Sequence, residues 1–183
     1  NLSLSAFSAN PATIRAGIGV AQASQADTLV FTTGRRSERF AMDRFPNFLE
    51  DQFIQTGDFF KASLDMAAGF SGIRQIIYTI FFGKAVKMAL GFEHTHAARS
   101  ELTLKELAVW ALEITQDKTL ADHIGAANTA RHAFDYIYPD YPDLLAFVGG
   151  KIVENAGRFS QRRFAIRAIL FDFNGQIAWD SQN

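Results

Sequence analysis

The sequence predicts an α+β fold that is predominantly α-helical, with a helical bundle around one central apolar helix and a small antiparallel β-hairpin near the C-terminus. Three observations support this fold class. Residues 60–92 form the most apolar stretch, several amphipathic segments follow it, and an Asn174-Gly175 pair lies between two short β-prone segments. A chain of 183 residues suits a single domain with a sizeable core.

The central helix is predicted over about residues 72–90. Its bulky residues recur at spacings of three and four: Ile73, Ile76, Ile77, Ile80, Phe81, Met88 and Phe92. Ser71 is a suitable N-cap and Gly91 a suitable stop. Arg74, Lys84 and Lys87 interrupt the stretch, which therefore lacks the roughly 18 uncharged apolar residues of a membrane span. We expect a soluble protein of unknown compartment.

Residues 1–34 have the composition of an N-terminal arm, because Arg15 and Asp27 are their only charges. Asn10 and Pro11 favour a short helix that Gly17 weakens, and Thr28–Thr33 has the β-branched character of a strand. Such an arm docks on a neighbouring subunit or lies on its own domain. The first residue is Asn rather than Met, which indicates a trimmed, processed or incomplete chain.

Residues 35–183 are predicted to form one helical domain that ends in the hairpin. Helical periodicity and caps predict helices near residues 48–56, 58–68, 100–115, 119–126, 128–138 and 140–157. Residues 164–173 and 176–180 are the predicted hairpin arms, with the strand at 28–33 as the candidate third strand. A helix over residues 158–172 is the competing interpretation of the first arm.

Composition and motifs exclude several kinds of chemistry. With no cysteine, the chain has no disulfide, thiolate nucleophile or cysteine-ligated metal. It also lacks a GxSxG elbow, a phosphate-binding glycine loop and a dinucleotide fingerprint. These absences favour a non-enzymatic protein over an enzyme, leave that question open, and nominate no catalytic residue and no cofactor.

The candidate metal ligands or general base are His94 and His96 with Glu93, together with His123, His132 and Asp135 further along the chain, and their spacing argues against a metal site. His94 and His96, which follow Glu93, diverge if they lie on a helix, and no HExxH pattern is present. Surface or capping histidines are the simpler interpretation. We therefore predict no bound metal.

Arginine and aromatic residues alternate in two clusters, residues 35–45 and 158–167. The arginines are Arg35, Arg36, Arg39, Arg44, Arg158, Arg162, Arg163 and Arg167. Guanidinium groups bind phosphates and aromatic rings stack on bases, so this pattern favours a groove for single-stranded RNA or DNA. The alternative is that these arginines pair with the domain's own carboxylates, which the net charge of -1 fits well.

Together these features predict a homo-oligomeric structural protein of the capsid or nucleoprotein kind, which self-associates through the arm and binds nucleic acid through the arginine clusters. The alternative is a helical sensor or small-molecule-binding domain. Its pocket would be aromatic, with Phe81, Phe82 and Trp110 in the lining.

Overall fold

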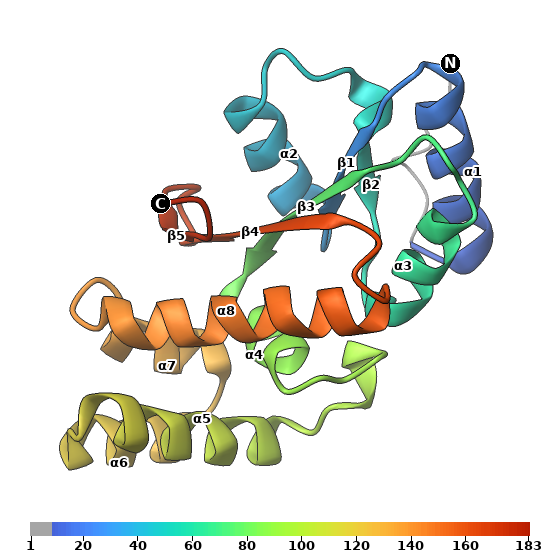
Figure 1. The fold of residues 1–183 in the computed structure, drawn as a ribbon. Coiled ribbons are helices and arrows are strands. Elements are labelled where there is room, and N and C mark those ends of the chain that lie inside the picture. Colours follow the sequence, from blue (N-terminus) through green and yellow to red (C-terminus); the bar gives the residue numbers. More distant parts are fainter. Residues whose placement is uncertain (1–8) are drawn as a thin grey trace.

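The computed structural model describes residues 9–183, which form eight α-helices and one mixed sheet of five strands (Figure 1). In chain order the elements are α1 (Pro11–Ala23), β1 (Thr28–Thr32), α2 (Arg35–Arg44), β2 (Phe53–Gln55), α3 (Phe60–Ala68), β3 (Gln75–Phe81), α4 (Phe82–Ala89), α5 (Ser100–Thr115), α6 (Lys118–Ala126), α7 (Ala130–Ile137), α8 (Pro142–Phe159), β4 (Ala165–Phe171) and β5 (Ile177–Asp180). Two 3-10 turns, Glu50–Gln52 and Thr95–Ala97, complete this part of the chain.

The sheet has the strand order β2-β1-β3-β4-β5. The first four strands are parallel, and β5 pairs antiparallel with β4. The chain therefore leaves β1 towards one edge to form β2 and then crosses back to form β3 on the other side of β1. This reversal creates a topological switch point between β1 and β3.

Both faces of the sheet are covered. Residues of α1, α3 and α8 pack in a large core against one face, which includes Leu29, Ile76 and Leu170. On the other face, α2 packs against a smaller core that includes Val30 and Ile77. Figure 1 shows α5 and α6 on the far side of α8 and α4 from the sheet, so the second half of the chain adds a helical layer.

The predicted central helix over residues 72–90 is wrong in its first half. Residues 75–81 form β3, the middle strand, and only residues 82–89 are helical, as α4. Ile76 and Ile80 enter the large core while Ile77 enters the small one. A strand buried on both faces has a continuous apolar run, which matches helical spacing as well as strand spacing. The molecule is therefore organised around the sheet rather than around a helix.

At the C-terminus, β4 and β5 form the antiparallel pair at the predicted place, although its strands, 165–171 and 177–180, are shorter than predicted. The turn between them is local: Asp172 Oδ1 accepts hydrogen bonds from the backbone N–H groups of Asn174 and Gln176, and Gly175 has φ +85°. The competing helix over 158–172 does not form, since α8 ends at Phe159. β1 also lies close to its predicted bounds, but it pairs with β2 and β3 and not with the hairpin.

Of the predicted arm over residues 1–34, residues 1–8 lie outside the described part of the chain. The rest forms α1 and β1, and Ile14, Ile18 and Ala21 of α1 are fully buried in the large core. Asn10 caps α1 by accepting a hydrogen bond from the Thr13 N–H. The division of the chain at residue 34 stays a prediction. Across residues 9–183, no helix has both the length and the apolar character needed to cross a membrane.

Candidate functional site

The carboxyl ends of β1, β2 and β3 lie side by side at the switch point. In the sheet register, Thr32 at the end of β1 is level with Gln55 of β2 and Thr79 of β3. Open α/β sheets bind ligands outside the carboxyl ends of their strands, where the strand order reverses. We therefore take the carboxyl edge in front of β1 as the candidate functional site.

The side chain of Ser37 hydrogen-bonds the backbone of the loop that leads from β1 into α2. Ser37 Oγ accepts hydrogen bonds from the backbone N–H groups of Thr33 and Gly34, both at 3.1 Å. A Cβ atom placed on Gly34 would meet nothing within 4 Å. The loop therefore presents free space at the start of α2, where the helix dipole favours negative charge.

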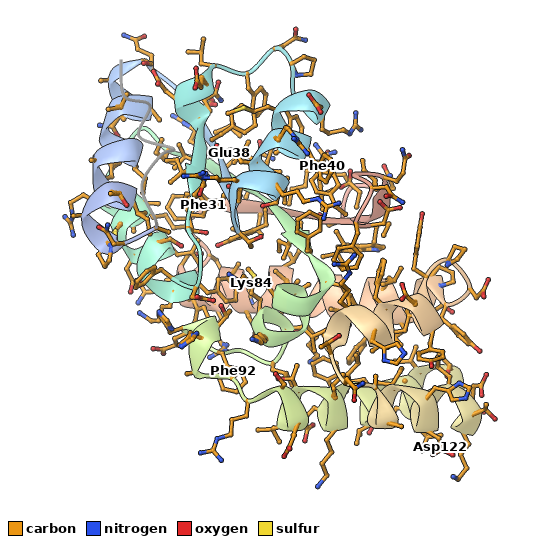
Figure 2. All side chains as sticks on the ribbon, turned by 180° about the vertical axis from the view of Figure 1, so that it is seen from behind. Phe31, Glu38, Phe40, Lys84, Phe92 and Asp122 are labelled. Atoms are coloured by element: carbon orange, nitrogen blue, oxygen red, sulfur yellow. The ribbon has the colours of Figure 1, made fainter. Side chains whose placement is uncertain are left out.

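An ion pair joins the segments that follow β2 and β3. Asp58, which follows β2, pairs with Lys84 of α4 at 3.1 Å between Oδ1 and Nζ. Thr95 donates a hydrogen bond from its hydroxyl to the same Asp58 oxygen. Partial burial opposes ionisation of Asp58, but the hydrogen bond from Thr95 and the positive charge of Lys84 outweigh it, so its pKa lies below the ordinary value. In Figure 2, Lys84 is seen between the sheet, marked by Phe31, and the helices below it.

A second carboxyl group near this edge, that of Glu38, has its pKa shifted in the direction opposite to that of Asp58. Glu38 of α2 is buried, and its carboxylate accepts a hydrogen bond from the side chain of Gln55, the last residue of β2. Burial raises the pKa of Glu38 more than this hydrogen bond lowers it. Two carboxyl groups near one sheet edge therefore have pKa values shifted in opposite directions.

Aromatic and arginine side chains cover the neighbouring ends of β3 and β4. The rings of Phe81 and Phe173 stack with centroids 5.5 Å apart. The Arg36 guanidinium donates a hydrogen bond to the backbone oxygen of Phe173, and the Arg131 guanidinium lies 4.3 Å from the centre of the Phe173 ring. This end of the sheet thus brings together side chains from α2, β3, α7 and the turn between β4 and β5.

The structure separates the two predicted arginine clusters. Arg35 and Arg36 begin α2, directly after β1, whereas Arg158, Arg162 and Arg163 precede β4. Because β1 and β4 run in the same direction in the sheet, these groups lie at opposite edges of it. Arg167 forms a bidentate ion pair with buried Asp180, at 2.6 and 3.0 Å, as the alternative interpretation predicts.

Of the predicted pocket residues, Phe81 and Phe82 belong to one aromatic cluster, because their partners Phe173 and Phe134 pack edge-on with centroids 5.7 Å apart, whereas Trp110 packs elsewhere. Phe81 stacks on Phe173, Phe82 packs with Phe134, and Trp110 packs with Phe147.

The predicted histidine pair lies at the surface after α4. The ring centres of His94 and His96 are 6.3 Å apart, and His94 packs edge-on against Phe59. Within the described residues, no group of three metal-ligating side chains could hold a metal ion.

Comparisons with known proteins show what this chain is similar to. Residues 94–182 match the model of the CbiD C-terminal domain. That range contains Thr95, Arg131 and Phe173 of the edge just described, but neither Gly34 nor Asp58. No solved structure matches the chain.

Relatives extend the similarity beyond the CbiD match to most of the chain. A relative from Nitratidesulfovibrio vulgaris is 36% identical over 166 residues, which is 90% of this chain and 42% of the relative. A relative from Leptospira borgpetersenii is 31% identical over 94% of this chain and 47% of its own length, and one from Paracidovorax citrulli is 36% identical over 92% and 46%. All three are named cobalt-precorrin-5B C(1)-methyltransferase. The chain spans less than half the length of these relatives.

These findings correct the functional prediction. The chain resembles methyltransferases of a small molecule, so the predictions of a capsid-like or nucleoprotein-like structural protein and of RNA or DNA as a partner are wrong. The physical reason is the placement of the arginines, which lie at opposite sheet edges and in part pair internally.

Sequence reasoning also missed the residues of the carboxyl edge. The helix predicted near residues 58–68 includes Asp58, yet α3 begins at Phe60 with Phe59 at its N-cap, and Asp58 pairs with Lys84 instead. The signal that could have found the edge is the order strand, Gly34, helix, which is typical of a loop at the carboxyl end of a parallel strand.

Proposed function

We propose that this chain carries part or all of a cobalt-precorrin-5B C(1)-methyltransferase, and that the methyl donor binds at the carboxyl edge in front of β1. The observation that carries the proposal is the similarity to relatives of that name over about nine-tenths of the chain. The open edge at the switch point supports it, because an α/β sheet of this topology binds small ligands there.

The reaction needs positioning more than covalent catalysis. A ring carbon of the substrate attacks the methyl carbon of a sulfonium donor, the new carbon–carbon bond forms as the carbon–sulfur bond breaks, and the electron pair of that bond remains on sulfur. The positive charge passes from the sulfur of the donor to the methylated ring system in this step. The protein has to hold the two carbons in line and keep water away from them.

Asp58 and Gly34 suit the donor. Asp58 is ionised at neutral pH, since Thr95 and Lys84 lower its pKa, and because both of them contact its Oδ1 atom, Oδ2 can accept hydrogen bonds from the donor. Gly34 leaves space directly in front of β1.

The test measures binding of S-adenosylmethionine by calorimetry and transfer of its labelled methyl group to cobalt-precorrin-5B. We expect Asp58→Asn to weaken donor binding by about tenfold or more, since one charge-assisted contact is lost. Asp65→Asn is the matched control, because Asp65 also pairs with a lysine, Lys61, but on the exposed surface of α3. This control should bind the donor as the unchanged chain does.

Two forms of the protein are tested: the chain alone, and the Nitratidesulfovibrio relative in which the chain replaces the corresponding segment. The proposal fails if neither form binds the donor and neither form transfers the methyl group. Equal weakening by Asp58→Asn and Asp65→Asn would contradict the assigned role of Asp58 alone.

A further inference from the structure

A separate pocket of about 240 Å³ lies among α4, α5 and α7. It is lined by Gly83, Lys87, Ser100, Thr103, Leu104, Thr129, Ala130 and Arg131. Pockets for whole drug-sized ligands usually measure about 300–1,000 Å³, so this one suits a small ion or one functional group of a larger molecule.

The lining is positively charged and has no acidic residue. Lys87 and Arg131 are its charged side chains, and neither forms an ion pair with any residue in the range 9–183. Lys84, one turn earlier on α4, differs because it pairs with Asp58. The half-buried Lys87 thus places an uncompensated positive charge at the wall of a cavity, which an anion would neutralise.

Hydrogen-bond donors surround the same space. Gly83, Ser100 and Ala130 lie in the first turns of α4, α5 and α7, where backbone N–H groups have no partner within the helix. The N-cap residues of α4 and α5 make no side-chain cap hydrogen bond. Thr129 caps α7 by accepting from the His132 N–H, so its own hydroxyl proton remains available to donate.

We propose that this pocket binds an oxyanion group, a carboxylate or a phosphate, of a small-molecule ligand. Two cations and the positive ends of three helices favour one negative group there. Arg131 also touches Phe173, which stacks on Phe81 at the end of β3, so the bound group would lie next to the carboxyl edge of the sheet. The proposal goes beyond methyl transfer and does not depend on it.

The experiment titrates sodium propionate and inorganic phosphate separately into the full chain by calorimetry at constant ionic strength, without methyl donor or precorrin. We expect one or both anions to bind at one site per chain, with Lys87→Met and Arg131→Met each weakening binding about tenfold. Lys105→Met, which removes an exposed positive charge on α5 outside this pocket, should leave binding unchanged.

The choice of anion identifies the ligand class, since propionate alone indicates a carboxylate, phosphate alone a phosphate, and both a general oxyanion site. Arg131→Lys keeps the positive charge and should therefore lose less affinity for the anion than Arg131→Met. The comparison of these two variants also guards against a folding defect. The proposal is overturned if neither anion binds, or if the Lys105 substitution weakens binding as much as the two pocket substitutions do.

Discussion

At the residue scale, the buried carboxyl of Glu38 makes stability depend on pH. Burial raises its pKa, so the folded state favours the protonated form more than the unfolded state does. The stability that this preference contributes is fully present below the unfolded pKa, near 4.5, and is lost as pH rises through the higher folded pKa. At neutral pH, where this stability is lost in whole or in part, the buried carboxyl of Glu38 therefore opposes folding.

Glu38→Gln should accordingly raise the free energy of unfolding at pH 7 and have a much smaller effect near pH 4, where the native side chain is already protonated. Urea unfolding at both pH values measures this difference. Glu113→Gln, on the exposed surface of α5, is the control and should have little effect at either pH. An equal gain for Glu38→Gln at both pH values would show that its charge is not the cause.

Tyr78 lowers the stability of the folded state for a different reason, because its buried hydroxyl has no hydrogen-bond partner among the described residues. Its ring packs edge-on against Phe31 and Phe60, with centroids 5.8 and 5.7 Å away, and burial raises its pKa far above the ordinary value. An unsatisfied buried hydroxyl costs stability, whereas the ring itself contributes to the core.

Tyr78→Phe should therefore raise the free energy of unfolding by about 1 kcal/mol. Tyr136→Phe, at an exposed position of α7, should change it by less than about 0.5 kcal/mol. Chemical denaturation provides the measurement. If Tyr78→Phe is instead destabilising, the hydroxyl makes a contact that the described residues do not account for.

At the scale of elements, the packing of α8 on β5 depends on one glycine. A Cβ atom at Gly149 of α8 would overlap the ring of Trp179 of β5, while one at the next residue, Gly150, would meet nothing within 4 Å. Gly149 is buried and Gly150 exposed on the same helix. Position 149 therefore has no room for a side chain, whereas position 150 has room for one.

Gly149→Ala should lower the free energy of unfolding by about 1–3 kcal/mol, because the rigid indole ring has to move. Gly150→Ala should raise it by about 0.5–1 kcal/mol, since alanine has the higher helix propensity. Thermal or urea unfolding of both variants tests the pair. A stabilising Gly149→Ala would mean that β5 is not held against α8 as the structure has it.

At the scale of the whole molecule, the sheet forms the centre and β3 its most enclosed strand. β3 pairs with β1 over five residues and with β4 over seven, and Ile76, Ile77 and Ile80 are buried. β2 is an edge strand of three residues. Opening β3 requires disruption of both cores, whereas β2 can open locally.

Hydrogen exchange should therefore be slowest at the backbone amides of residues 76–80, and faster by at least about a factor of ten at residues 53–55. Exchange followed by nuclear magnetic resonance or mass spectrometry measures it. If residues 82–89 were instead protected more strongly than 76–80, the helix would be the stable centre, as the sequence alone had predicted.

The sequence by itself determined the features that depend on nearby residues. The Asn10 cap with Pro11 predicts α1, Thr28–Thr33 predicts β1, and Asn174-Gly175 predicts the turn between β4 and β5. In each case the deciding hydrogen bonds or backbone angles lie within a few residues of the signal.

Only the tertiary structure decided the features that join distant segments. β1 and β3 pair although Thr28 and Gln75 are far apart in the chain, and this pairing made the isoleucine run a strand instead of a helix. The same folding brought Asp58, Lys84 and Thr95 together and separated the two arginine clusters. The spacing of nearby residues does not encode these contacts, for two reasons. Burial on both faces of a strand removes the periodicity that distinguishes a strand from a helix. Parallel strands are joined by long connections, so their pairing leaves no local turn signal in the sequence.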